Sequence, residues 1–142
     1  MEVRWAAHGS PDYRQLVELR RRVLRIPLGL DFTPEQLAGE VADLHLGAWE
    51  GDQLLGCLLL SDRGQGTVQM RQVCVEPTLQ RSGVGAALVV ESEAEARRRE
   101  FQRMMLHARD TAVGFYLRLG YAAVGDPFEE VSIPHQEMVK DL

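Results

Sequence analysis

The sequence predicts a single-domain α/β (α+β) fold, with a mixed, mostly antiparallel sheet of six to seven strands flanked by about four helices. Three observations predict it. The chain has 142 residues, 45% of them hydrophobic, which suits one core and one domain over residues 1–142. Short strand patterns alternate with helical ones. Residues 68–76, 83–99 and 103–108 follow one another as strand, helix and strand, and such a crossover makes the two strands parallel.

The first third of the chain predicts a strand and two helices. Residues 2–8 have a strand pattern, and Pro11 stands where a helix begins. Thr33 is a suitable N-cap for the second helix, with Pro34 at its first position. Apolar residues recur at helical spacing along the first helix, until a proline and a glycine end the pattern: Leu16, Leu19, Val23, Ile26, then Pro27 and Gly29. Its arginines form either a solvated face, which we expect, or a rim that steers an acidic group: Arg14, Arg20, Arg21, Arg22 and Arg25.

The remainder predicts three consecutive antiparallel strands, two further helices and three more strands. Gly51-Asp52 joins strands 46–50 and 53–61 in a hairpin, and a second turn leads into strand 68–76. On helix 83–99, Glu93 with Arg97 and Glu95 with Arg99 are four residues apart and are expected to pair on a solvated face. The other elements are strand 103–108, a short helix capped by Asp110 or Thr111 and closed by Gly120, and strands 121–124 and 136–139.

Composition limits the class of protein. A net charge of -5 and a pI near 5.4 argue against nucleic acid as a partner and weakly favour a cationic one such as an amine. Cys57 and Cys74 lie in apolar strand patterns and are expected in the core, with no disulfide framework and no metal site. No apolar leader or membrane-spanning run is present, so we expect a cytoplasmic protein without a membrane partner.

The turn from Gln80 to Ala86 has the strongest chemical signal. A strand that ends, turns through glycines and opens a helix directs free backbone N–H groups toward one point, which attracts an anion such as phosphate. No lysine follows Gly85, which excludes the P-loop pattern, and Leu88 stands where a dinucleotide fingerprint requires its third glycine. The phosphate therefore belongs to another cofactor.

The chain resembles the GCN5-related N-acetyltransferases (GNAT). Gly83-x-Gly85 is followed, after the appropriate intervening elements, by Phe115-Tyr116-x-x-x-Gly120-Tyr121. Residues 128–138 resemble the closing segment of the ElaA-like branch. The resemblance implies a sheet whose fourth and fifth strands splay apart, with acetyl-CoA as co-substrate in the cleft between them.

The resemblance and the backbone chemistry together assign the donor site. Exposed amides of Val73, Cys74 and Val75 are expected to pair with the amide groups of pantetheine, as a ligand adds to a strand edge. Arg81 contacts the phosphates or faces solvent, and Arg109 replaces an asparagine that helps to hold pantetheine in many relatives. The pyrophosphate is expected on the N–H groups of the turn, whose residues are Gln80, Arg81, Ser82, Gly83, Val84, Gly85 and Ala86.

The sequence offers one candidate for the general acid and several for the base. Tyr116 matches the family's general acid, or serves only to anchor its helix in the core. Gln69 stands where histone-modifying relatives have a glutamate that acts as the general base. The side-chain amide of Gln69 cannot accept the proton of the amine. Glu76 and His135 are the leading candidates for the base, and Asp110 and His107 are further ones. Alternatively, Glu76 is only a turn residue at the end of its strand. The resemblance also places a backbone N–H near Val75 at the oxyanion.

The acceptor is the least determined part of the site. Leu28 and Phe32 are candidates to line its pocket together with His107, or they staple two helices together. His8 and His45 belong to no constellation and are expected at solvent or edge positions.

We therefore expect direct transfer of an acetyl group from acetyl-CoA to a primary amine of a small molecule or peptide, without a covalent enzyme intermediate. The alternatives are a non-catalytic acyl-CoA-binding sensor or regulatory module, and an interaction domain without ligand. A homodimer is left open.

Overall fold

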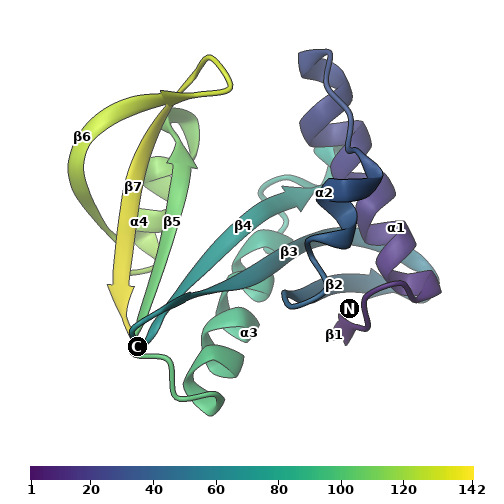
Figure 1. Cartoon of the computed structure of the whole chain (residues 1–142), viewed down its shortest axis with the longest axis horizontal. Helices are drawn as coiled ribbons and strands as arrows, with labels where there is room; N and C mark the ends of the chain where they lie inside the picture. The colour runs from purple at the N-terminus through teal and green to yellow at the C-terminus, as the bar shows by residue number, and fades with distance from the viewer.

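The structure is a computed structural model that describes residues 1–142, with seven strands in one sheet and four α-helices (Figure 1). The strand order is β1-β2-β3-β4-β5-β7-β6, and every neighbouring pair is antiparallel except β4 and β5, which are parallel. The predicted fold class is confirmed. The elements are β1 (Glu2–Ala6), α1 (Pro11–Arg20), α2 (Pro34–Ala38), β2 (Leu44–Glu50), β3 (Gln53–Gly64), β4 (Thr67–Val75), α3 (Val84–Arg98), β5 (Arg103–Arg109), α4 (Val113–Arg118), β6 (Ala122–Glu130) and β7 (Ile133–Asp141).

Two hydrophobic clusters cover the two faces of the sheet. The larger joins α3 and α4 to one face, with Leu58, Leu88, Met104 and Met138 almost fully buried. The smaller lies under α1 and contains Cys57 and Cys74, which confirms the core position predicted for both cysteines. No helix combines the length and apolar character needed to cross a bilayer.

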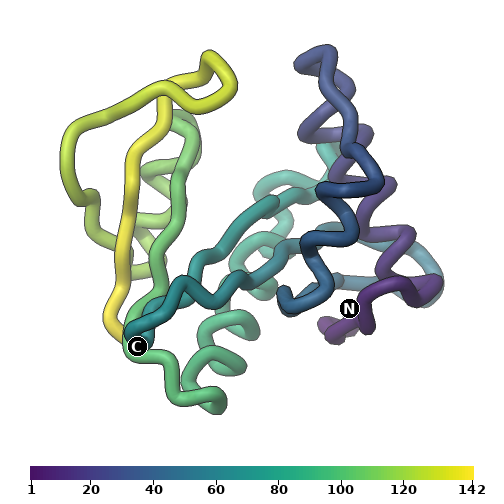
Figure 2. Tube along the Cα trace, viewed as in Figure 1, coloured from purple at the N-terminus to yellow at the C-terminus, as the bar shows by residue number.

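The central feature of the sheet is a short junction. β4 pairs with β5 only from Thr67 to Met70, against Arg103 to Leu106. Beyond these four pairs the strands diverge, so the sheet opens into a V whose arms are β4 and β5 (Figure 2). The splay that the family resemblance implied is therefore present.

Several boundaries differ from the sequence prediction. α1 ends at Arg20, and the chain continues through a π-helical turn, Arg21–Arg25, and a 3₁₀ turn, Ile26–Leu28. β6 extends to Glu130, because a register shift between Val124 and Phe128 accommodates the Gly-Asp-Pro segment that masks the strand pattern.

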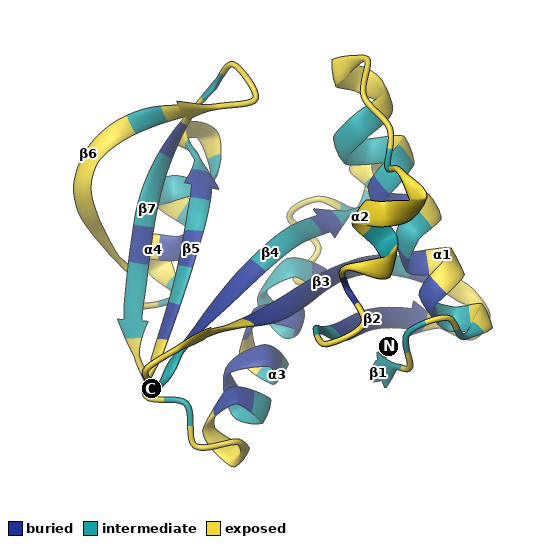
Figure 3. Ribbon diagram, viewed as in Figure 1, coloured by how far each residue is buried: buried dark blue, intermediate teal, exposed yellow.

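The prediction of a wholly solvated arginine face on the first helix is wrong for Arg20. Buried residues occur along α1 (Figure 3). The side chain of Arg20 is only 2% exposed and forms a two-armed ion pair with Glu40, at 2.9 and 2.5 Å, while Tyr13 donates to the same carboxylate at 2.8 Å. His45 is buried as well, contrary to prediction, and its Nε2 lies 3.0 Å from the carbonyl oxygen of Glu40. The polar network joins α1 to the segment after α2.

The predicted pairing along α3 is half correct. Arg99 pairs with Glu95 at 2.8 Å. Glu93, however, is buried and pairs with Lys140 at 3.1 Å and with the hydroxyl of Tyr121 at 2.8 Å, instead of with Arg97. This buried carboxylate ties α3 to the end of β7.

Candidate active site

The open edge of β4 presents backbone groups to the splay. Glu76 N–H donates to Leu55 O of β3 at 2.9 Å, and Val75 pairs with Gly56. Amide groups alternate along an antiparallel ladder, so the N–H of Val75 faces the splay. The ladder is irregular at Val73, because the register shifts between Cys57 and Leu59 and Gln72 has a φ of 55°. The amide of Cys74 is directed toward β3, and the side chain of Cys74 lies in the α1 cluster. Of the three predicted strand residues, Val75 therefore directs its backbone amide toward the splay and Cys74 does not.

The N-terminus of α3 lies directly after this edge and leaves backbone donors free. Gly83 is its N-cap, with φ 91° and no side-chain cap, and the first helical bond runs from Ala87 N–H to Gly83 O at 3.0 Å. The N–H groups of Val84, Gly85 and Ala86 consequently have no helical acceptor. Free donors at the positive end of a helix suit a phosphate, so this turn fits the pyrophosphate of CoA.

The other turn residues divide by role. Arg81 is exposed and holds a φ of 67°, and Gln80 is extended. Ser82 donates its hydroxyl to Leu79 O, so that hydroxyl hydrogen is already used within the turn. A Cβ at Gly85 would lie 3.3 Å from the ring of Phe115, so this glycine is also required for the close packing of α4 against α3.

We predict that Gly83→Ala weakens acetyl-CoA binding by roughly 10-fold. A side chain at φ 91° costs on the order of 1–2 kcal/mol, and relief of that strain rotates the first N–H groups of α3 out of alignment. Isothermal titration with acetyl-CoA measures the change. Gly9→Ala is the matched control, because Gly9 has φ 79° and equally open surroundings but precedes α1. Equal affinities for both variants would contradict the prediction.

Tyr116 lies on α4 and is 6% exposed. Its ring packs against Phe115 and Tyr121, with centroids 5.0 and 5.7 Å away, while its hydroxyl has no hydrogen-bond partner in the protein. Burial raises the pKa of the phenol above its ordinary value of 10. The group is therefore a protonated donor at neutral pH.

The two predicted bases have different surroundings. Glu76 is bound by Arg22 at 2.7 Å, so its carboxylate is already engaged at the end of β4. His135 is buried at the start of β7, and its Nδ1 donates to Ile133 O at 2.7 Å. Its Nε2 keeps a lone pair in the neutral ring and lies 3.6 Å from Oε2 of Glu130. His135 is thus the better proton acceptor of the two.

The residues predicted to line the acceptor pocket do not lie together. Phe32 lies beneath the guanidinium groups of Arg20 and Arg25, 4.7 and 4.9 Å from its centroid, and Leu28 is 38% exposed. His107 lies on β5, across the splay from them, where its Nδ1 is 3.2 Å from Glu130 and its ring contacts Phe128. Phe32 thus packs against the arginines of the α1 segment and has no contact with His107.

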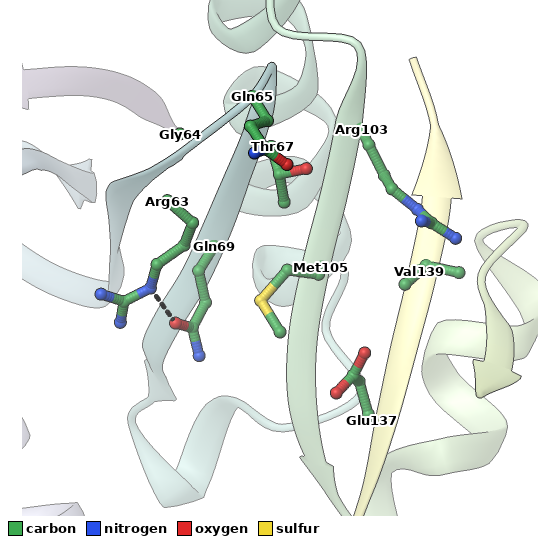
Figure 4. Close-up of a pocket in the computed structure, with 9 residues that line it drawn as sticks. All are labelled: Arg63, Gly64, Gln65, Thr67, Gln69, Arg103, Met105, Glu137 and Val139. Carbon is green, nitrogen blue, oxygen red and sulfur yellow. Dashed lines mark hydrogen bonds between the residues drawn. The ribbon is translucent and has the colours of Figure 1, made fainter. Parts of the chain in front are cut away.

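A hollow of about 310 Å³ lies where the β4–β5 junction closes, on the face of the sheet opposite α3 and α4 (Figure 4). Gln69 lies in its wall and accepts a hydrogen bond from Nε of Arg63 at 2.6 Å. Sequence reasoning missed Glu137, a carboxylate from β7 that lies in the same hollow. Alternation along residues 136–139 indicates which residues share a face of the strand with Glu137, but not that this strand lies beside β5. The hollow is lined by Arg63, Gly64, Gln65, Thr67, Gln69, Arg103, Met105, Glu137 and Val139.

Comparison with known proteins identifies the class. A family model described as an acetyltransferase (GNAT) domain matches residues 31–142, which is well over half of the chain. The chain therefore belongs to the GNAT acetyltransferase family, and the predicted membership is confirmed.

Individual proteins resemble this chain over part or nearly all of its length. The Bacillus subtilis (strain 168) protein YyaT is 29% identical over 76 residues, covering 54% of this chain and 51% of that protein. This chain spans about half the length of the curated relatives it matches. An acyl-CoA N-acyltransferase from Pseudomonas aeruginosa has 26% identity and a TM-score of 0.80, covering 98% of both chains. Escherichia coli ElaA has 22% identity and a TM-score of 0.81, also covering 98% of both. The likeness to ElaA concerns the fold, and the ElaA-like branch stays a prediction.

Proposed function

We propose that this chain transfers an acetyl group from acetyl-CoA directly to a primary amine of a small molecule or peptide. One observation carries the proposal. The edge of β4 that β5 leaves unpaired beyond Met70 is followed, after the 3₁₀ turn Pro77–Leu79, by the free N–H groups at the N-terminus of α3. The extended pantetheine arm of CoA, which ends in a pyrophosphate, matches this arrangement of backbone groups.

The residues of the chain then have separate roles. Acetyl-CoA supplies a thioester, which is the activated acyl donor. Val73 and Val75 hold its amide groups through their backbone, the turn from Gln80 to Ala86 holds the pyrophosphate, and the N–H near Val75 stabilises negative charge on the acyl oxygen. Tyr116 donates the proton that the departing sulfur needs. His135 is the proposed proton acceptor for the amine.

The two cysteines support direct transfer. Cys57 is fully buried, and its pKa is raised well above the ordinary value, with a hydrogen bond involving Cys74 as the largest cause and burial next. Cys74 is 3% exposed, and its thiol donates to Leu19 O at 3.9 Å. Because a thiolate is the nucleophilic form of cysteine, neither side chain is suited to carry the acyl group.

Two measurements on the whole chain test the proposal. Acetyl-CoA at 100 times its Kd should raise the unfolding midpoint by roughly 5 °C or more. Free thiol should then appear when primary amines are added. Stabilisation by acetyl-CoA without thiol release for any amine would favour the acyl-CoA sensor. The presence of Gln69, where a catalytic glutamate would act as base, also favours the sensor. Absence of both responses would leave an interaction domain.

A further inference from the structure

The hollow beside the β4–β5 junction holds charges of both signs that the protein itself does not neutralise. Arg103 and Glu137 line it, and the side chain of neither forms an ion pair or a hydrogen bond with another residue. Other carboxylates in this chain do pair with arginine, as Asp31 does with Arg21 and Glu95 does with Arg98. An unpaired cation and an unpaired anion in one concave site favour a ligand that carries both charges.

Strand register sets the order of the groups. Arg103 pairs with Thr67 and Asp141 at the closed end of the junction, whereas Glu137 pairs with His107, the first β5 residue beyond the junction. Between these two rows lies the pair Met105 and Val139, which is apolar. Figure 4 shows the four side chains on one face of the sheet, with Met105 and Val139 between the two charged ones.

This order also fixes which end meets the donor site. Glu137 lies beside the point where the splay opens, and the donor edge of β4 begins there. Arg103 lies several residues away at about 3.3 Å per residue, with Arg63 on the opposite wall. Nε of Arg63 is used by Gln69, but its two terminal nitrogens have no protein acceptor. The cationic end of the hollow is therefore the end distant from the transfer reaction.

We propose that the acceptor is an aliphatic amine that also carries a carboxylate, separated from the amine by a short carbon chain. The ammonium group binds at Glu137, the methylene groups lie over Met105 and Val139, and the carboxylate binds Arg103. The inference deepens the proposed function and rests on it. It differs from the expectation based on net charge, because a chain of net charge -5 presents arginine at the far end of this hollow.

Matched acceptors test the proposal. With acetyl-CoA saturating, thiol release is measured for 5-aminovalerate against pentylamine and for 4-aminobutyrate against butylamine, at one pH. Within each pair the chain length is equal and only the carboxylate differs. The acids should have a kcat/KM at least about 10-fold higher, since a charge-assisted contact to arginine is lost in the plain amines. Equal or faster turnover of the plain amines would overturn the acceptor class and leave the proposed function standing.

Variants locate the effect. Arg103→Met should remove the preference for the acids by raising their KM, while the thermal shift with acetyl-CoA reports separately on the donor site. Arg97→Met, on the exposed side of α3, is the control and should keep the preference. Glu137→Gln should lower kcat/KM for acids and amines alike. A preference that survives Arg103→Met would overturn the proposed orientation. Thiol release with other primary amines but with neither amino acid would overturn the acceptor class and leave the proposed function standing.

Discussion

Tyr116→Phe should lower kcat by about 100-fold or more with acetyl-CoA and amine both saturating. The hydroxyl that is removed has no partner in the protein, so the substitution leaves the packing of the ring against Phe115 and Tyr121 unchanged. Loss of a positioned general acid typically costs 10²–10⁴ in rate. Steady-state thiol release measures the effect, and the KM for acetyl-CoA should stay close to that of the unmodified chain.

Tyr121→Phe is the matched control for this prediction. Its hydroxyl donates to the buried carboxylate of Glu93, and both burial and that carboxylate raise its pKa. Its removal should lower the unfolding midpoint and leave kcat unchanged, which is the opposite pattern. If Tyr116→Phe retained full kcat, the tyrosine would be only an anchor of α4, which was the alternative left open by the sequence.

Glu40→Gln should destabilise the fold by about 3–5 kcal/mol. Arg20 is 2% exposed and Glu40 accepts hydrogen bonds from both Arg20 and Tyr13, so removing the carboxylate charge leaves a buried guanidinium without its counterion. Urea unfolding at pH 7 measures the free energy of unfolding. The hydrogen bonds from Arg20 lower the pKa of the Glu40 carboxyl below 4.5, although burial alone would raise it. The unfolded state therefore binds more protons near that pH, and stability conferred by Glu40 is lost as the pH falls through and below 4.5.

Two controls separate the buried charge from general disruption. Asp31→Asn removes the partner of Arg21 in an ion pair whose side chains are 40% and 50% exposed, and should change the stability far less than Glu40→Gln does. The double variant Arg20→Met/Glu40→Leu should recover most of the stability lost in Glu40→Gln, because no unpaired charge stays buried. A loss below 1 kcal/mol for Glu40→Gln alone would show that the pair is solvated in solution.

Local patterns were sufficient for the order of the elements and for the geometry of the turn before α3. The turn around Gly83 and Gly85 has a chemistry that depends on consecutive residues, so its geometry follows from the sequence itself. The same holds for the capping box at Thr33 and Gln36, whose side chains and backbone amides bond reciprocally at 3.1 and 2.9 Å. The interrupted strand β6 was underestimated because Gly125 and Pro127 look like a turn.

Features that depend on distant residues could not be predicted in this way. Arg20 belongs to an arginine-rich helix side, and only the return of the chain after α2 brings Glu40 to it. Glu93 stands four residues before Arg97, yet the end of β7 supplies Lys140 and decides the pairing. Glu137 becomes a candidate site residue only when β7 inserts between β5 and β6, an order that the sequence does not specify.

The short junction between β4 and β5 affects how a ligand associates with the protein. Only four residue pairs join the two halves of the sheet, but one continuous core under α3 and α4 spans both halves, including Leu58 from β3 and Met104 from β5. Close packing on that side sets the angle between the halves before anything binds. The protein is therefore a preorganised wedge, and the conformational entropy cost of association falls on the flexible ligand instead of on the sheet.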